Sequence, residues 1–237
     1  MTTTGTTLFN LNFAELAEES FERCGSELRS GYDLKTARRS LNLLLIEWQN
    51  RGLNLWEVEQ LEIPMVTGQA VYPLPLDTVD LLDQVIRTGS DQNQSDITIS
   101  RISGSTYSTI PNKTALGKPI QVWINRQTGA TTPTGVAYST INVWPTPQSP
   151  GNQYTFVYWR LRRMQDAGNG ANTQDVPYLF LPALVAGLAY YLAMKLPNVD
   201  MNRASALKMV YDEQFELAAS ENREKAPVRM VPRMSFN

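Results

Sequence analysis

The chain has 237 residues, of which 42% are hydrophobic and 19% are charged, and its formal net charge at pH 7 is −2. Such a chain can bury a sizeable core, and its charge balance excludes a globally basic nucleic-acid binder. It contains no histidine and one cysteine, Cys24. The commonest general base and zinc ligand are therefore missing, and an internal disulfide is excluded. We expect no cofactor, no metal site and no catalytic residue.

The first fifty residues carry two amphipathic helical patterns. Asn12 followed by Glu15 is typical of a capped helix start, and Cys24 lies on the apolar face as a buried thiol. We expect Gly31 to end this helix and Asp33 to cap a second one that stops at Gly52. The apolar face of the second helix is formed by Leu34, Ala37, Leu41, Leu44, Leu45 and Trp48. Residues 1–54 are thus predicted to form an antiparallel helical hairpin.

Residues 55–165 form a β-rich region in this prediction, because short segments alternate apolar and polar residues between Thr-, Pro- and Gly-rich turns. The expected strands are 55–65, 69–74, 81–88, 120–126, 140–144 and 154–161. Thr67-Gly68 predicts a hairpin between the first two strands. Residues 97–110 are compatible with a strand or with a short helix over 103–108. No helix long enough for a parallel crossover intervenes, which favours an antiparallel sheet, sandwich or small barrel.

Residues 166–224 predict a second helical pair, one helix opening at Asp175 and the other running from about Asp200 to Glu224. The expected fold class is α+β, a helical bundle of N- and C-terminal helix pairs with a central antiparallel β-rich insertion. An extended arm over 225–237 follows.

The segment 176–194 lacks charged residues over a length that raises the alternative of a membrane-associated oligomer. Its two prolines, its glycine and its paired tyrosines favour instead a helix buried in a bundle that meets another subunit. The N-terminal residues lack the pattern of a signal peptide, so we expect synthesis and folding in a reducing cytoplasm.

Two groups of carboxylates are the candidates for catalysis by acidic side chains alone. Glu57, Glu59 and Glu62 form one group, and Asp80 and Asp83 form the other. In a strand, Glu57 and Glu59 would point to the same, solvent-exposed face. This pattern favours a solvated strand face over a hydrolase site.

The last fifteen residues are locally basic on an acidic chain, and apolar residues lie between the charges. Two prolines keep the segment from continuing a helix. It is either a disordered tail or an arm that becomes ordered on a partner. The candidate partner-binding residues are Arg223, Lys225, Arg229, Met230, Arg233 and Phe236.

In order and spacing, the chain resembles the head-to-tail adaptor proteins of short-tailed bacteriophages, also called tail tubular protein A or head-completion proteins. The likeness spans most of the chain and rests on seven segments, none of them catalytic: 37–42, 48–52, 110–114, 117–119, 122–126, 143–147 and 184–196.

The resemblance implies a structural protein of the virion neck, with no enzymatic role. It implies a ring, usually of twelve copies, that contacts the portal protein and the tail nozzle protein, with tail fibres as further candidate partners. Duplex DNA would pass through the channel without specific binding, and the ring would help to retain the packaged genome. The six residues of the C-terminal arm would then bind the portal. The alternatives are a carboxylate-dependent, tail-associated cell-wall hydrolase and a membrane-associated oligomer that uses residues 176–194.

Overall fold

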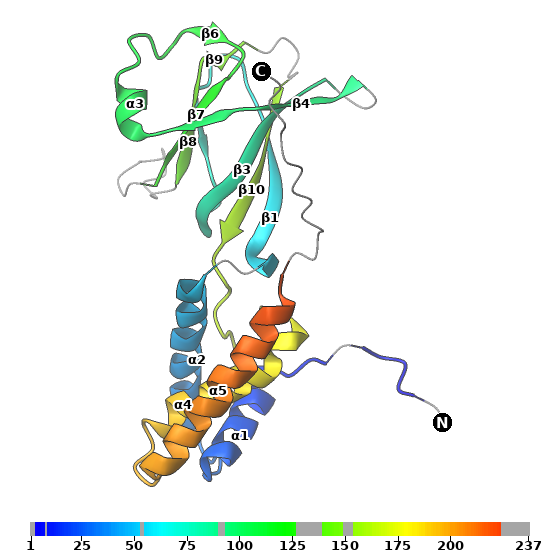
Figure 1. Cartoon of the computed structure of the whole chain (residues 1–237), viewed down its shortest axis with the longest axis vertical. Helices are drawn as coiled ribbons and strands as arrows, with labels where there is room; N and C mark the ends of the chain where they lie inside the picture. Colours follow the sequence, from blue (N-terminus) through cyan, green and yellow to red (C-terminus); the bar gives the residue numbers. More distant parts are fainter. Residues whose placement is uncertain are drawn as a thin grey trace, which may run out of the picture. The chain divides into compact units, whose positions relative to one another are not determined.

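The computed structural model describes residues 3–7, 9–52, 55–89, 93–126, 139–148 and 154–223. The chain divides into two compact units, Met1–Leu55 with Gln165–Asn237, and Trp56–Met164. The first holds helices α1, α2, α4 and α5 and is called the helical unit; the second holds the named strands and is called the β unit (Figure 1). The predicted α+β class is confirmed.

Helix α1 spans Phe13–Cys24 and begins as its sequence predicts. The side chain of Asn12 accepts a hydrogen bond from the backbone N–H of Glu15, and the Glu15 carboxylate accepts from the N–H of Asn12. The prediction that Gly31 ends this helix is wrong. Gly25 ends it in the left-handed conformation, with φ of 77°, where glycine carries no steric penalty.

Helix α2 spans Gly31–Arg51, so Gly31 is its first residue. Ser30 caps the helix, and Asp33 is the third helical residue, whose carboxylate accepts from the backbone N–H of Ser30. The prediction of Asp33 as the cap is therefore wrong by three residues, because Ser30 and Asp33 form a capping box. Its buried residues are Ala37, Ser40, Leu41, Leu44, Leu45 and Trp48.

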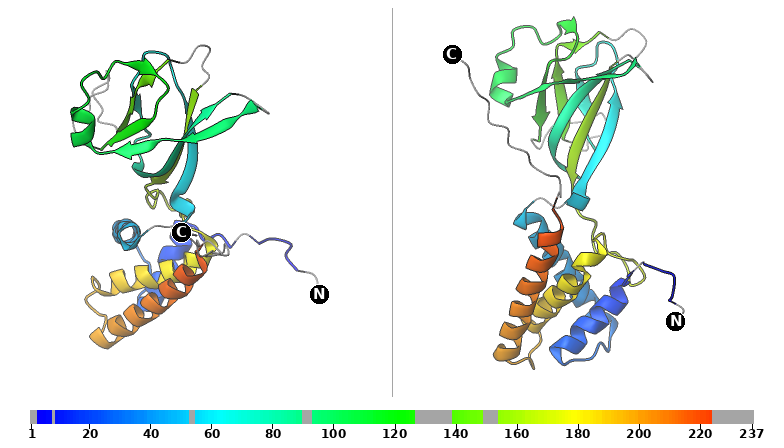
Figure 2. Two further views of the ribbon diagram at one scale, coloured as in Figure 1. Left: turned by 45° about the horizontal axis from the view of Figure 1, so that its top comes forward. Right: turned by 45° about the vertical axis from the view of Figure 1, so that its right-hand side comes forward.

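The second helical pair is α4, Leu181–Ala193, and α5, Met201–Glu221. A 3₁₀ turn over Tyr178–Phe180 precedes α4, so the helix starts six residues later than the predicted Asp175. Pro182 at the start of α4 costs no hydrogen bond, because the first helical N–H groups have no partner inside the helix. Helix α4 contacts α1, α2 and α5, and Figure 2 shows it among them.

Three helices meet at Gly187 on α4. A Cβ atom built there would lie 2.9 Å from a methyl carbon of Leu44 on α2 and 2.9 Å from a ring carbon of Tyr211 on α5. A side chain at this position would therefore push α2 and α5 away from α4. The glycine thus allows α2 and α5 to approach α4 closely.

The β unit contains two four-stranded sheets. One has the order β1-β10-β3-β4, with the strands Val58–Pro64, Tyr154–Arg162, Thr78–Thr88 and Ser95–Thr98. The other has the order β2-β8-β7-β5, with the strands Val71–Pro73, Thr140–Trp144, Gln121–Asn125 and Ser100–Ile102. A two-stranded ladder joins β6, Leu116–Gly117, to β9, Thr146–Pro147. The pairs β5–β7 and β6–β9 are parallel, and the other pairs are antiparallel, as expected for most of the insertion.

The hairpin predicted at Thr67-Gly68 is wrong. Strand β1 pairs with β10 and β2 pairs with β8, so the chain passes from one sheet to the other at this turn. Gly68 has φ of 82° there, and its N–H donates to the carbonyl of Pro147. Met65 and Tyr72, on either side of the turn, both lie in the core of the unit. Burial of these two side chains in one core favours the crossing over a hairpin.

The undecided segment 97–110 contains both kinds of structure, β4 and β5 followed by the short helix α3, Gly104–Ser108. The hydroxyl of Ser103 caps α3 by accepting from the N–H of Thr106. The core of the β unit is formed by Met65, Tyr72, Leu74, Leu81, Ile86, Ile99, Val122, Ile124, Ile141, Val143, Phe156 and Tyr158.

Candidate interaction surfaces

Of the six residues predicted to bind a partner, the structure describes one. Arg223 is exposed and follows the C-terminal end of α5. Lys225, Arg229, Met230, Arg233 and Phe236 lie outside the described residues.

The carboxylates considered for catalysis are spread over the β unit. Glu57 belongs to a 3₁₀ turn, Leu55–Glu57, and is 1% exposed, so the prediction that it lies on a solvated strand face is wrong. Glu57 lies in this turn and Glu59 lies in β1, so the alternation of side chains along a strand does not apply to the two together. Glu59 forms an ion pair with Arg160 at 2.6 Å, and Glu62 forms one with Arg87 at 2.6 Å.

The two aspartates of the second group are also engaged. Asp80 forms ion pairs with Arg101 at 2.8 Å and with Arg126 at 3.2 Å. The carboxylate of Asp83 accepts from the backbone N–H of Gln84. Glu59, Glu62 and Asp80 are thus each paired with arginine and do not form a pair of free carboxylates. Within the described ranges, no group of three Cys, Asp or Glu side chains is placed to hold a metal ion.

A polar network ties three helices of the helical unit together around Glu47 on α2. Its carboxylate accepts from the hydroxyl of Tyr191 on α4 at 2.6 Å and from that of Tyr211 on α5 at 3.2 Å. Arg51 donates to the same carboxylate at 2.9 Å, and its guanidinium lies 4.4 Å from the ring centre of Phe215. Sequence reasoning missed this network. Glu47 and Arg51 are four residues apart, which is a readable signal, but the tyrosines come from helices 144 and 164 residues away.

The pKa values of this network follow from its geometry. Burial acts to raise the pKa of Glu47, but the hydrogen bonds from Tyr191, Arg51 and Tyr211 outweigh it and the pKa is lowered. Burial, with the neighbouring Glu47, raises the pKa of Tyr191 to about 12. Burial also raises the pKa of Tyr211. At neutral pH the site therefore holds an ionised carboxylate between two neutral phenols.

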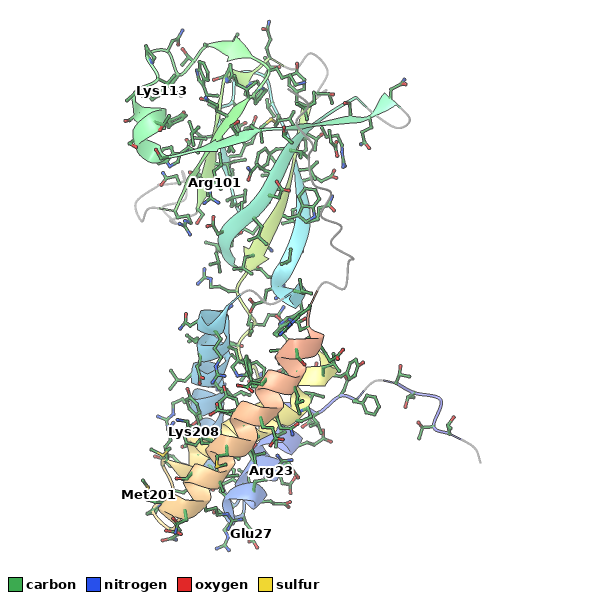
Figure 3. The ribbon with its side chains drawn as sticks, viewed as in Figure 1. Arg23, Glu27, Arg101, Lys113, Met201 and Lys208 are labelled. Atoms are coloured by element: carbon green, nitrogen blue, oxygen red, sulfur yellow. The ribbon has the colours of Figure 1, made fainter. Side chains whose placement is uncertain are left out.

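A groove of about 980 Å³ runs along α1 and the start of α4, and we call it the acidic groove. Four glutamates of α1 line it, Glu15, Glu18, Glu19 and Glu22. Apolar side chains line the rest: Phe9, Leu11, Tyr178, Leu181, Pro182 and Val185. Arg23, labelled in Figure 3, also lines it and forms an ion pair with Glu19 at 2.8 Å.

The register of α1 and α4 orders the two kinds of side chain along the groove. Ser20 donates to the carbonyl of Val185 at 3.3 Å, and the Cys24 thiol donates to the carbonyl of Ala189 at 3.1 Å. Both pairs differ by 165 positions, so the two helices run side by side in the same direction. Tyr178, Leu181 and Pro182 therefore lie toward the N-terminal end of α1 and the later glutamates toward its C-terminal end.

The outer face of α2 carries a second surface, which we call the α2 stripe. Its members, within about 80° of the helix circumference, are Tyr32, Lys35, Arg39, Leu43, Ile46 and Asn50, all exposed. Leu43 and Ile46 are each 53% exposed and Tyr32 is 71% exposed. The stripe is basic toward its N-terminal end and apolar toward its middle, and it carries no acidic side chain.

Helix α5 also leaves large apolar side chains exposed. It buries Ala204, Tyr211 and Ala218, spaced seven residues apart along one narrow face. Met201, labelled in Figure 3, and Met209 are more than 70% exposed, and Leu217 is 56% exposed. A helix that meets its own unit along so narrow a face has most of its surface available to other molecules.

Most of the charge-free segment 176–194 forms α4, which is buried inside the helical unit. Nine of the thirteen residues of α4 are buried. Within the described ranges, none of the helices combines the length and hydropathy that a membrane-spanning segment needs.

Comparison with known proteins gives one family. The sequence model of the SU10 adaptor protein family matches residues 11–232, which cover the whole β unit and most of the helical unit. No curated protein matches the chain.

Proposed function

The chain belongs to the SU10 adaptor protein family, and from this membership we propose that it forms a ring that joins the portal to the tail nozzle of a phage. The family makes the protein a structural phage adaptor of the virion neck, as the resemblance predicted. In the proposal, twelve copies extend the DNA channel, help to retain the packaged genome and provide a platform for tail parts, including fibres.

The family match over nearly the whole chain carries this proposal. The surfaces of the helical unit support it. Exposed Leu43 and Ile46 on α2 are apolar groups that a ring subunit would cover against its neighbours. The carboxylates of the β unit give a hydrolase no support, because Glu59, Glu62 and Asp80 are each paired with arginine.

We further propose that the segment from Arg223 to Phe236 docks on the portal. Arg223, Lys225, Arg229 and Arg233 would meet portal carboxylates, and Met230 and Phe236 would enter apolar sites between them. Twelve weak contacts on one ring would reinforce one another through effective concentration.

Deletion of residues 227–237 tests the arm. Helix α5 ends at Glu221, so the deletion should leave circular dichroism and thermal unfolding unchanged. Attachment to purified portal rings, counted by electron microscopy, should be lost, and heads completed with the truncated protein should leak DNA. A deletion of residues 3–7, which are exposed, is the matched control and should attach normally. Normal portal occupancy of the 227–237 deletion would refute the arm as the docking element.

A further inference from the structure

We propose that the α2 stripe of one copy docks into the acidic groove of the next, and that this contact closes the ring. The inference rests on the proposed function, to which it adds the contact between subunits. The two surfaces have complementary chemistry: the groove combines four glutamates with an apolar end, and the stripe combines Lys35 and Arg39 with Leu43 and Ile46.

The charges on both surfaces are available for such a contact. Within the described part of the chain, the side chains of Glu18, Glu22 and Lys35 make no hydrogen bond and no ion pair. Among the residues that the structure describes, the guanidinium of Arg39 donates to the hydroxyl of Thr36 at 3.3 Å and forms no ion pair. Pairing these groups between copies would therefore break no ion pair inside a subunit.

The two surfaces also match in length and order. The groove has its apolar end near Tyr178 and Leu181 and its later glutamates roughly 10 Å further along α1, at 1.5 Å per residue. On α2, Ile46 lies about 10 Å from Arg39. With α2 antiparallel to the partner's α1, the basic end meets the glutamates while Leu43 and Ile46 meet the apolar end.

The contact joins two different surfaces, so it does not end with a dimer. The groove is lined by α1, the segment before it and the start of α4, whereas the stripe lies on α2, so the two surfaces share no residue and can serve two neighbours. A contact of this head-to-tail kind produces a closed ring when the rotation between copies closes.

Charge reversal on each surface tests the contact. The groove variant is Glu18→Lys with Glu22→Lys, and the stripe variant is Lys35→Glu with Arg39→Glu. Light scattering and native mass spectrometry would follow association of the purified chain alone, and electron microscopy would follow it on portal rings. Each variant should associate at least about tenfold more weakly than the wild type, because like charges then face each other. The matched control reverses two exposed glutamates of α5, Glu213→Lys with Glu216→Lys, and should associate as the wild type does.

An equal mixture of the two variants gives the sharper result. The basic groove of one variant accepts the acidic stripe of the other, and the acidic groove of the second accepts the basic stripe of the first. The mixture should therefore assemble although neither variant does so alone, with the two variants alternating and an even number of copies. Misfolding of a variant cannot produce this recovery.

Three outcomes overturn the proposal. The first is wild-type association of either variant, and the second is a mixture that remains unassembled. The third is recovery of the groove variant by Arg229→Glu with Arg233→Glu instead of by the stripe variant, which would identify the C-terminal segment as the occupant of the groove. A wild-type chain that stays monomeric both alone and on portal rings contradicts the ring itself, and so separates failure of the proposed function from failure of this interface.

Discussion

Trp48 is the side chain whose removal should damage the helical unit most. It is 0% exposed, and its ring centre lies 5.6 Å from that of Phe180 and 5.3 Å from that of Phe215. Its indole N–H donates to the hydroxyl of Tyr211 at 2.8 Å. One residue of α2 thus contacts the turn before α4 and two residues of α5.

We expect Trp48→Ala to lower the free energy of unfolding of the helical unit by about 3–5 kcal/mol, the range for large aromatic residues replaced by alanine in cores. Trp48→Phe keeps an aromatic ring and loses the N–H donor, so it should cost about 1–2 kcal/mol. The Tyr211 hydroxyl still donates to Glu47 in both variants, so no buried donor is left without an acceptor. The difference between the variants therefore measures the ring packing.

Urea unfolding followed by circular dichroism at 222 nm would measure these changes. The other four tryptophans, Trp56, Trp123, Trp144 and Trp159, belong to the β unit, and their fluorescence reports on that unit separately. Met209→Ala, at a side chain 73% exposed, is the control and should change the free energy by about 0.5 kcal/mol or less. A loss below about 1 kcal/mol for Trp48→Ala would refute the assigned packing of α2 against α4 and α5.

Two further predictions concern charge. Glu47→Gln should lower the free energy of unfolding at pH 7 by about 1–3 kcal/mol, since charged hydrogen bonds are lost. Folding lowers the pKa of Glu47 below its ordinary value of 4.5, so the ionised carboxylate stabilises the folded state fully above pH 4.5. This stabilisation is lost as the pH falls through the pKa of the folded state. In urea titrations, the free energies of unfolding of the variant and the wild type should therefore be closer together at pH 3 than at pH 7. The isolated chain should bind duplex DNA only non-specifically, with a Kd of roughly 10⁻⁴ to 10⁻⁶ M at physiological salt; sub-micromolar, sequence-specific binding in a fluorescence anisotropy titration would contradict the adaptor proposal.

The helices could be predicted from sequence because their signals are local. The capping box of Asn12 and Glu15 and the apolar spacing of α2 lie within a few turns of chain. The errors were also local: Ser30 and Asp33 form one capping box, and the sequence pattern alone favoured the wrong member as the cap.

The pairing of the strands could not be predicted in the same way. Alternation of apolar and polar residues indicates which face of a strand is buried and does not identify its partner. Strand β1 pairs with β10, about 100 residues later, while the nearby β2 joins the other sheet. The ion pair between Glu59 on β1 and Arg160 on β10 is a consequence of that pairing. The prediction for Glu57 was wrong because the strand was expected to begin at residue 55. The chain forms a 3₁₀ turn over Leu55–Glu57, and the strand begins only at Val58.

The two candidate surfaces also differ in whether the sequence could predict them. The acidic groove exists only where α1 lies beside α4, in a register that joins residues 165 positions apart, and no local pattern predicts it. The α2 stripe could have been found in the sequence, because Leu43 and Ile46 point away from the face that contains Leu41, Leu44 and Trp48. A second apolar face on one helix indicates a second partner.

The charged groups of α2 are divided between the interior network and the outer face, and this division separates stability from assembly. Glu47 and Arg51 contact Tyr211 and Phe215 inside the helical unit, so their replacement should lower stability. Lys35 and Arg39 are exposed and form no ion pair among the described residues, so their reversal should change the free energy of unfolding little. A stripe variant that unfolds like the wild type and yet fails to assemble would therefore have lost a contact between copies rather than its fold.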